Sequence, residues 1–320
     1  MQHQKIAIIG GTGFIGGNLA CELARQRRCI RVITRRRERD RRLLVIPTLE
    51  LVEADVHSTS SLSAALAGCD AVVNMTGVLH ARARPGQSFH DVHAQLPRKI
   101  AEAARFNRIK RVLHMSALGA AADAPSEYLR SKAAGEDAVH AEAATGLHVT
   151  SFRPSVVFGP HDSFLNLFAR LLALSPGVFP LACAQARFAP VYVGDVVEAY
   201  IRALDDVATA GQRYELCGPR SYTLHELVAY TAQVIGRKRL IIALPDALAR
   251  LQARVLGLLP GAPFTMDNYL SMQVDNVCGD DGLARLGICA QSLESIAPSY
   301  LAGSRKERLY SEFRTSAGRD

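Results

Sequence analysis

Short apolar runs alternate with segments of helical periodicity along the first half of the chain, and this alternation constrains the fold more than any other feature. Continuous apolar runs are typical of parallel strands that are buried on both faces of a sheet. Their alternation with helices is typical of an α/β architecture. We therefore predict an α/β fold, a doubly wound parallel sheet with helices on both faces. The runs are Lys5–Ile9, Ile30–Ile33, Leu49–Val52, Ala71–Asn74, Arg111–Met115 and His148–Phe152.

The second half of the chain is less regular, because Pro and Gly interrupt it repeatedly between 159 and 263. This change predicts two domains, which agrees with a length of 320 residues. The first domain is expected to span 1–158, with 187–217 returning to it. A smaller C-terminal substrate domain is expected from 159–186 and 218–303. The polar segment 304–320 is expected to be a mobile tail.

Composition places the chain among soluble globular proteins, since 48% of its residues are hydrophobic and 21% are charged. The seven cysteines are widely spaced, without a Cys-x-x-Cys pair, and we expect them to be reduced core residues. The sequence shows neither a secretory signal nor an apolar run long enough to span a membrane. These features predict a cytoplasmic location, with a peripheral contact at the inner face of a membrane left open.

A glycine motif, Gly-Gly-Thr-Gly-Phe-Ile-Gly, follows the first apolar run and opens a helical segment. Glycines in this position permit a tight turn, a close approach of the backbone to a pyrophosphate, and close helix packing. The helix N-terminus adds amide donors and a positive dipole end. The motif predicts a Rossmann-type dinucleotide site, against the alternative of a structural glycine turn. The predicted contacts are Gly10, Thr12, Gly13, Phe14, Ile15 and Gly16.

Arginines follow the second apolar run, where enzymes that prefer NAD commonly place a carboxylate. Arg35 and Arg36 are suited to grip the 2′-phosphate of NADP through paired hydrogen bonds. NADP is therefore the predicted cofactor, with NADPH preferred over NADH, and a solvated basic loop is the alternative. Residues 25–42 hold ten arginines and two acidic residues, so this stretch accounts for the whole formal charge of +8. Charge that is confined in this way argues against nucleic acid as a partner.

Tyr128 and Lys132 are four residues apart on a predicted helix and therefore share one face. A nearby ammonium favours the tyrosinate, so the phenol could exchange a proton with a substrate oxygen while hydride passes to or from a cofactor.

Longer segments resemble the extended short-chain dehydrogenase/reductases, and in particular the atypical branch that contains the nucleotide-binding accessory subunit of respiratory complex I. The segments are Val112–Ala120, Tyr128–Ala133, Arg153–Pro160 and Pro190–Val196. The resemblance implies a Rossmann domain with bound NADP(H). It also implies that Asp55 and Val56 lie near the adenine, Thr76 and Gly77 along the cofactor, Val156 and Val157 near the nicotinamide, and that Pro154, Tyr128 and Lys132 are among the contacts.

Two positions depart from the pattern of that superfamily. The catalytic hydroxyl is expected at Ser116, but the alignment of extended enzymes could instead place it on Ala117, which has none. Asparagine is usual in the pattern where this chain has Val92-His93-Ala94. Tyr128 and Lys132 could therefore serve catalysis together with Ser116, or serve only to hold the nicotinamide ribose.

Other kinds of site find little support in the sequence. His90 and His93 share a helical face, but two imidazoles without further ligands do not predict a metal site, and we expect none. Motifs for serine hydrolases and P-loop NTPases are absent. Leu248–Leu259 carries two arginines opposite leucines, which suits either an ordinary packed helix or a helix on a membrane surface.

Three functional hypotheses follow. The preferred one is an NADP(H)-binding accessory or nucleotide-sensing protein with a respiratory or quinone-pathway partner. The second is an NADP-dependent oxidoreductase that acts on an unidentified small or lipophilic carbonyl, with Tyr128 as acid/base and Lys132 as its activator. The third is a sugar-nucleotide epimerase or dehydratase.

Overall fold

The computed structural model describes residues 5–40, 43–80, 86–259 and 264–302, so the predicted tail 304–320 lies outside the described residues. The chain divides into two compact units, each made of several segments. Unit 1 is Met1–Pro154, Val193–Leu216 and Cys278–Cys289, and unit 2 is Ser155–Tyr192, Cys217–Val277 and Ala290–Asp320.

Unit 1 is built on a parallel sheet that, over the described residues, has seven strands in the order β11-β6-β5-β4-β1-β2-β3. Every neighbouring pair in this order runs parallel. The predicted doubly wound Rossmann class is confirmed, and all six predicted apolar runs form strands. The strands are β1 (Lys5–Ile9), β2 (Cys29–Thr34), β3 (Leu49–Glu53), β4 (Ala71–Asn74), β5 (Arg111–Met115), β6 (His148–Pro154) and β11 (Arg213–Leu216).

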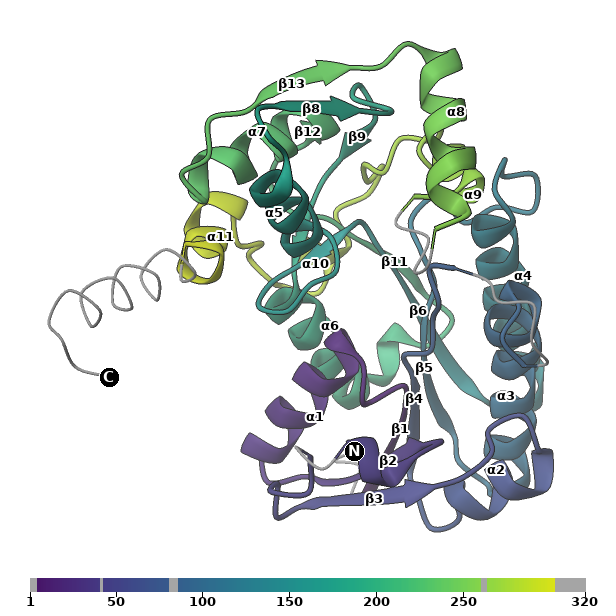
Figure 1. Cartoon of the computed structure of the whole chain (residues 1–320). Helices are drawn as coiled ribbons and strands as arrows, with labels where there is room; N and C mark the ends of the chain where they lie inside the picture. The colour runs from purple at the N-terminus through teal and green to yellow at the C-terminus, as the bar shows by residue number, and fades with distance from the viewer. Residues whose placement is uncertain (1–4, 41–42, 81–85, 260–263, 303–320) are drawn as a thin grey trace, which may run out of the picture. The chain divides into compact units, whose positions relative to one another are not determined.

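Helices cover both faces of this sheet (Figure 1). One face carries α1 (Phe14–Arg25) and α6 (Val193–Asp205), and the other carries α2 (Thr59–Leu66), α3 (Leu96–Phe106) and α4 (Glu127–Ala141). A short π-helix, η3 (His90–Gln95), leads directly into α3. The remaining short helices of the unit are η1 (Arg37–Arg39), η4 (Glu142–Thr145), η5 (Val207–Thr209) and α10 (Gly282–Arg285).

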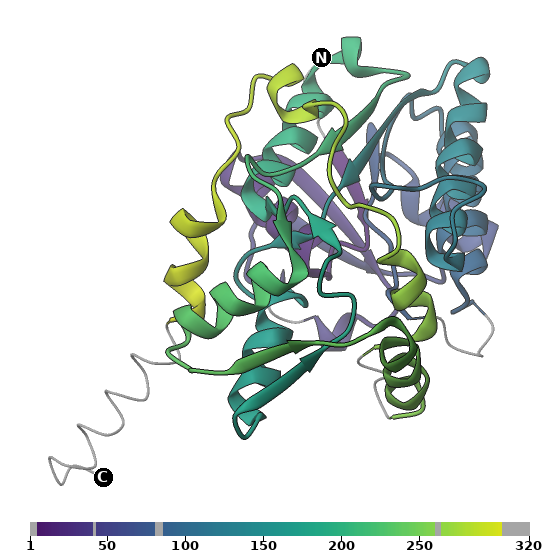
Figure 2. The same cartoon turned by 90° about the horizontal axis from the view of Figure 1, so that it is seen from above.

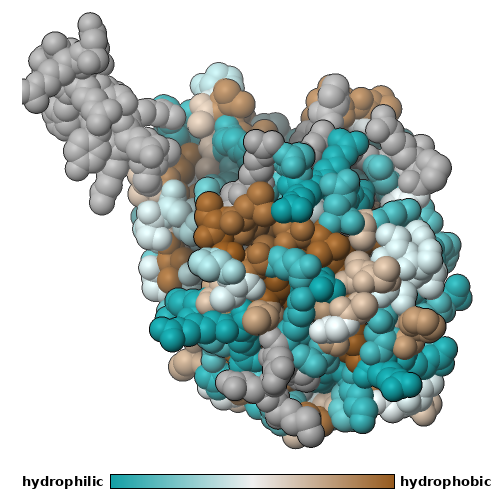
Figure 3. All heavy atoms as spheres, turned by 90° about the horizontal axis from the view of Figure 1, so that it is seen from below, coloured by the Kyte–Doolittle hydropathy of each residue, from teal (hydrophilic) through white to brown (hydrophobic). Residues whose placement is uncertain are grey.

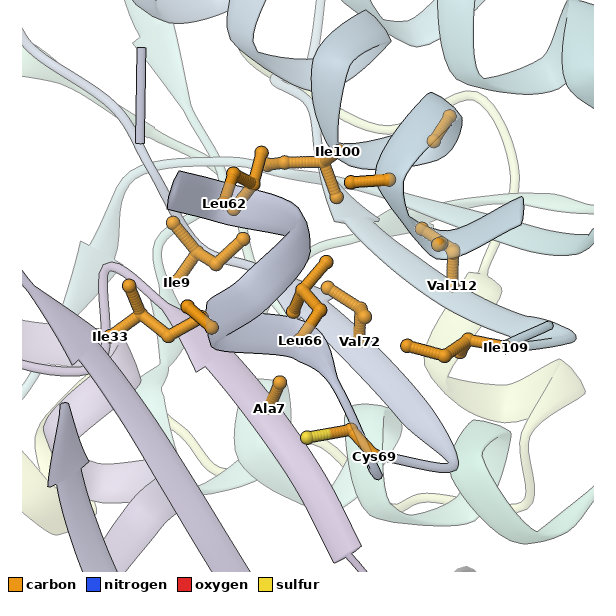
Figure 4. Packing of buried hydrophobic residues seen from close by; sticks show 14 of the residues in the cluster. Ala7, Ile9, Ile33, Leu62, Leu66, Cys69, Val72, Ile100, Ile109 and Val112 are labelled. Carbon is orange, nitrogen blue, oxygen red and sulfur yellow. The ribbon is translucent and has the colours of Figure 1, made fainter. Parts of the chain in front are cut away.

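One apolar core of unit 1 lies between the sheet and α2 and α3. Leu62 and Leu66 of α2 and Ile100 of α3 are fully buried and belong to one cluster with Ile9 and Val72 of the sheet (Figure 4). Burial of each such side chain contributes about 1.5–3 kcal/mol to folding.

The sheet order reverses between β1 and β4, which are adjacent although β2 and β3 separate them in sequence. In open α/β sheets, ligands bind outside the carboxyl ends of the strands at such a switch point. A ligand site is therefore expected at the loops after β1 and β4.

Unit 2 combines short strand pairs with helices around a separate apolar cluster, in which Phe158, Leu165, Leu172 and Leu227 are buried. Figure 2 shows the same cartoon from above. Figure 3 shows the face seen from below, where hydrophobic residues reach the surface between hydrophilic ones. The elements are β7 (Val157–Phe158), α5 (Leu165–Leu174), β8 (Val178–Leu181), β9 (Arg187–Phe188), β10 (Val191–Tyr192), β12 (Tyr222–Thr223), α7 (Leu224–Val234), β13 (Leu240–Ala243), α8 (Asp246–Gly257), α9 (Met266–Ser271) and α11 (Leu293–Leu301).

The cysteines differ from the expectation of reduced core residues. Cys217 and Cys278 are disulfide-bonded, and Cys21, Cys29 and Cys289 are exposed. The expectation was wrong for these five, because spacing along the sequence reveals neither which cysteines are disulfide-bonded nor which thiols lie on the surface. The cysteines therefore no longer argue for a reducing compartment.

Candidate functional site

The glycine motif forms the loop between β1 and α1, and the backbone there is too close-packed for side chains. Gly10 has a φ of +83°, and a Cβ on it would lie 2.8 Å from the Met75 carbonyl. A Cβ on Gly16 would lie 2.4 Å from the Gly10 carbonyl oxygen. The Gly13 amide donates to that same oxygen at 3.0 Å, which closes the turn. This geometry supports the roles of a tight turn and close helix packing.

The start of α1 also suits an anionic ligand. Its N-cap is Gly13, which is exposed and provides no side-chain cap, and its first turn has no acidic residue. In contrast, α2 and α4 begin at Ser58 and Ser126, whose side chains accept from the amides of their helices. The N-cap residue of α1 thus offers its amides no side-chain acceptor, and pyrophosphate is a group that such a helix end favours. Phe14 and Ile15 are the first helical residues, and Thr12 precedes Gly13 in the turn.

Arg35 and Arg36 lie directly after β2, and both are exposed. The Arg36 amide donates to the Thr34 hydroxyl at 3.4 Å, and that hydroxyl donates to Asp40 at 2.9 Å. The backbone after β2 is therefore held while the two guanidinium groups remain on the surface beside the switch point. Their contact with a 2′-phosphate stays a prediction.

The loop after β3 contains Asp55 and Val56. Asp55 is exposed, and one of its carboxylate oxygens accepts from the His57 amide at 2.9 Å, while its own amide donates to Ser61 at 3.1 Å. Val56 is buried in the core cluster. Their predicted role near an adenine is not tested by these contacts.

Asn74 fixes the loop that follows β4. Its side-chain oxygen accepts from both the amide and the hydroxyl of Thr76, at 3.1 and 2.6 Å. Its amide nitrogen lies 3.1 Å from Nδ1 of the buried His114. Burial lowers the pKa of His114 well below its usual value, so this imidazole is neutral. Thr76 and Gly77, the predicted cofactor contacts, are thereby held at the end of β4.

Tyr128 and Lys132 lie on α4, which begins at the N-cap Ser126. The Lys132 ammonium is buried and donates to the carbonyls of Met115 at 3.1 Å and Thr76 at 3.4 Å. Burial lowers the pKa of Lys132 to about 8, although Glu136 acts in the opposite direction. A Cβ on Gly77 would lie 3.4 Å from Lys132 Nζ, so the lysine reaches the β4 loop.

His93 connects the β4 loop to α4. Its Nε2 accepts from the Val78 amide at 3.0 Å, and its Nδ1 lies 3.0 Å from the Ser131 hydroxyl. That hydroxyl donates to the Tyr128 carbonyl at 2.7 Å, so Nδ1 of His93 carries the proton. The His93 ring also meets the Tyr128 ring edge-on, with centroids 5.4 Å apart. Burial, and next the nearby Lys132 charge, lower the pKa of His93 to about 2 and keep the ring neutral.

The backbones of η3 and α4 also cross closely at His93. A Cβ on Gly135 would lie 1.7 Å from the His93 carbonyl oxygen. Irregular π-turns are frequent at functional sites, and here the turn places an imidazole between a predicted cofactor loop and a predicted catalytic helix.

Ser116 lies just after β5, and its hydroxyl donates to the Glu136 carboxylate at 2.7 Å. Both side chains are buried. Glu136 is also paired with Arg153 at 2.9 Å and Arg213 at 2.8 Å, which satisfies a carboxylate that burial would otherwise destabilise. The Ser116 hydroxyl therefore belongs to a buried ion-pair network, and the next residue, Ala117, offers no hydroxyl in its place. A catalytic role for Ser116 remains a prediction.

The remaining predicted cofactor contacts belong partly to unit 1 and partly to unit 2. Pro154 ends β6 in unit 1, and its carbonyl accepts from the Leu118 amide at 3.1 Å. Val156 and Val157 belong to unit 2, where the Val156 amide donates to the Asn276 side chain at 3.1 Å.

Within unit 1 the structure thus brings Gly77, Tyr128 and Lys132 together, and it adds residues that the sequence did not assign. His93 appeared only within Val92-His93-Ala94, a segment where asparagine is usual, while Asn74 and Ser131 were not singled out. The position of Ser131, three residues after Tyr128 on the same helix, was a signal that could have identified it.

The described part of the chain offers neither a membrane-spanning helix nor a metal-binding cluster. No helix there combines the length and apolar character that a membrane crossing requires. Over the same residues, no group of three or more His, Cys, Asp or Glu side chains is arranged to hold a metal ion.

Known proteins resemble the chain over most of its length. It is 30% identical over 296 residues to NADH dehydrogenase (ubiquinone) 1 alpha subcomplex subunit 9, mitochondrial, of Arabidopsis thaliana, covering 86% of this chain and 71% of the relative. It is 34% identical over 249 residues to a ceramide reductase of Caulobacter vibrioides, covering 75% of this chain and 74% of the relative.

A solved structure of similar fold is the NADPH-dependent quinone oxidoreductase of Escherichia coli in complex with NADPH. It has a TM-score of 0.70 at 21% identity and covers 95% of this chain and 99% of that chain. At this identity the likeness concerns the fold alone.

The family model that matches is described as the NAD dependent epimerase/dehydratase family, and it matches residues 6–217, which include the glycine loop, Tyr128 and Lys132. The match and the glycine-loop geometry together support the binding of a nicotinamide dinucleotide. The chain belongs to the NAD dependent epimerase/dehydratase family.

Proposed function

We propose that this protein binds NADP(H) in unit 1 and acts as an accessory or nucleotide-sensing protein. The glycine loop and the uncapped start of α1 suit a pyrophosphate. Arg35 and Arg36, exposed after β2, are suited to the 2′-phosphate that distinguishes NADP from NAD.

One observation carries the accessory role. The Ser116 hydroxyl donates to the buried Glu136 rather than standing free to meet a reacting oxygen, and Ala117 has no hydroxyl. A nucleotide could be held tightly by such a site, with Tyr128 and Lys132 hydrogen-bonded to the nicotinamide ribose.

The partner and the location belong to the same proposal. The relative from Arabidopsis thaliana, whose similarity covers 86% of this chain, is named as a subunit of NADH dehydrogenase (ubiquinone). This supports a respiratory or quinone-pathway assembly as the partner. We place the protein in the cytoplasm at the inner face of a membrane, where such an assembly and nicotinamide nucleotides meet.

A second candidate is an NADP-dependent oxidoreductase that acts on a small or lipophilic carbonyl. The geometry of α4 favours it: Lys132 is buried between two carbonyls with its pKa lowered to about 8, one turn from Tyr128. A bound nicotinamide cofactor would supply the hydride. Tyr128 would exchange the proton at the substrate oxygen, and the Lys132 ammonium would stabilise the tyrosinate. A sugar-nucleotide epimerase or dehydratase is the third candidate, which the family description allows.

The experiment that separates these candidates starts with mass spectrometry of any nucleotide that the purified protein retains. The absorbance of bound NADPH is then followed while quinones, lipophilic carbonyls and nucleotide sugars are added. The accessory proposal expects retained NADP(H) and no turnover with any of them. Turnover that Tyr128→Phe abolishes would overturn it and support the oxidoreductase.

A further inference from the structure

Helix α8 packs on the rest of unit 2 through its smallest side chains. Ala249 is 2% exposed and Ala253 is 1% exposed, and both belong to a cluster with Ala182 and Tyr269. A surface helix ordinarily turns its larger apolar residues toward the core. In α8 the alanines occupy that face.

The opposite face of the same helix presents large apolar side chains to solvent. Leu248, Leu251 and Val255 are 48, 54 and 53% exposed, and Leu258, at the C-cap, is 88% exposed. These positions recur at the spacing of one helical face. The α8 segment is thus apolar on the side that faces away from the protein.

The strand pair β8–β13 presents a similar surface just before α8. Leu240 pairs with Val178, and Ile242 pairs with Pro180. All four residues are exposed. Because alternate residues of a strand share a face, Leu240 and Ile242 lie on one side of the pair. β13 leads directly into α8 at the same end of the unit (Figure 1). We call the exposed residues Leu240, Ile242, Leu248, Leu251, Val255 and Leu258 the apolar surface of unit 2.

Basic residues accompany this apolar surface. Residues 164–181 and 236–259, which contain α5, β8, β13 and α8, hold six basic residues and one acidic residue. The acidic residue, Asp246, is paired with Arg250 at 2.9 Å. The side chains of Lys238 and Arg254 are exposed in these segments. Helix α9, which packs on α8, adds one acidic residue, Asp267, so basic residues still outnumber acidic ones around the apolar surface.

We propose that unit 2 docks on an anionic lipid surface through the apolar surface and its basic neighbours. This proposal rests on the proposed function, which places the protein at the inner face of a membrane. It specifies which surface of the protein would contact that membrane. An exposed apolar helix face flanked by cations is the arrangement by which helices lie in the interface of an anionic bilayer. A second copy of the chain fits less well, because a two-fold contact would bring two basic surfaces together.

The test measures sedimentation of the full chain with phosphatidylcholine vesicles that contain or lack phosphatidylglycerol. The wild type is expected to bind the anionic vesicles more tightly, and rising salt is expected to weaken this binding. Leu251→Gln/Leu258→Gln should weaken binding about tenfold or more, because two leucines no longer enter the interface. Lys238→Gln/Arg254→Gln should remove most of the preference for phosphatidylglycerol.

Matched controls lie on unit 1. Phe106 is an exposed apolar residue and Lys110 an exposed lysine, so Phe106→Gln and Lys110→Gln should leave vesicle binding unchanged. Thermal unfolding and NADPH affinity are measured for each variant. If docking and nucleotide binding are separate, Leu251→Gln/Leu258→Gln loses vesicle binding but keeps the NADPH affinity of the wild type. The failure of the docking proposal can then be distinguished from the failure of the proposed nucleotide binding.

The proposal is overturned if the wild type does not bind anionic vesicles at low salt, or if Leu251→Gln/Leu258→Gln binds as well as Phe106→Gln. It is also overturned if the protein forms a concentration-dependent dimer that Leu251→Gln/Leu258→Gln breaks while vesicle binding is absent. In that case a second copy covers the surface.

Discussion

Unit 1 and helix α8 of unit 2 use large apolar residues in opposite ways. In unit 1, side chains such as Ile9 and Leu62 are fully buried between sheet and helices. In α8, alanines face the protein and leucines face outward. The large apolar residues of unit 1 form a core beside the glycine loop, whereas those of α8 form an exposed surface.

The difference teaches where each region is sensitive to substitution. The Gly10–Gly16 crossing in unit 1 has no room for a single methyl group. Leu251, Val255 and Leu258 on the outer face of α8 are more than half exposed, so polar substitutions there should change binding to a surface more than folding. The following predictions test this contrast.

The largest effect is expected from Gly16→Ala. The added methyl would lie 2.4 Å from the Gly10 carbonyl oxygen, so the loop must shift and its amides leave the positions that suit a pyrophosphate. We expect NADPH affinity to fall about a thousandfold, which corresponds to ~4 kcal/mol. Titration calorimetry measures it.

The control for this substitution is Gly17→Ala, one residue further along α1. A Cβ there would meet the Gly11 carbonyl oxygen at 3.7 Å, an ordinary contact. Equal losses in the two variants would contradict the close-packing account.

The second prediction concerns the pH dependence of stability through Lys132. Its pKa is lowered from 10.5 to about 8 in the folded protein, so between these values the unfolded chain binds more protons. The free energy of unfolding of the wild type, relative to Lys132→Met, should therefore rise by roughly 3 kcal/mol as pH increases from 8 to 10.5. Denaturant unfolding across this range checks it, and a flat difference would show that burial does not lower the pKa of Lys132.

A smaller effect is expected from His93→Asn. The shorter side chain loses the ring contact with Tyr128 and cannot make both of the bonds to Val78 and Ser131, which costs about 1–2 kcal/mol of unfolding free energy. His90→Asn changes an exposed histidine of the same π-helix and should cost almost nothing. If both variants unfold alike, His93 does not connect the β4 loop to α4.

The smallest effect on stability is expected at α8. Leu251→Gln/Leu258→Gln should change the free energy of unfolding by no more than about 0.5 kcal/mol, as is usual for exposed positions. Ala253→Leu, on the packed face, should cost about 1–3 kcal/mol through overpacking. Thermal and denaturant unfolding measure both, and the reverse order would mean that the leucines pack inward in solution.

The six strands of unit 1 that were predicted could be read from the sequence because strands buried on both faces have continuous apolar runs. The seventh strand, β11, was not predicted, since Arg213 and Glu215 give it a polar character at the edge of the sheet. The segment Cys278–Cys289 joins unit 1 from far along the chain, and no local pattern indicates such a return.

The candidate site was predictable in part. The glycine loop and the Tyr128–Lys132 pair are local patterns, and their spacing alone brings the residues together. The bonds of His93 and the burial of Ser116 against Glu136 depend on contacts across 15 to 38 residues, which periodicity does not encode. For α8, periodicity identified two faces but could not say which one packs inward.

The most direct test of the central claim compares the dissociation constants of NADPH and NADH for the wild type and for Arg35→Ser/Arg36→Ser. If unit 1 holds NADP(H) with these arginines at the 2′-phosphate, NADPH binds the wild type at least about tenfold more tightly than NADH. The double variant should lose this preference while keeping its affinity for NADH. Wild-type protein that binds NADH as tightly as NADPH would contradict the account.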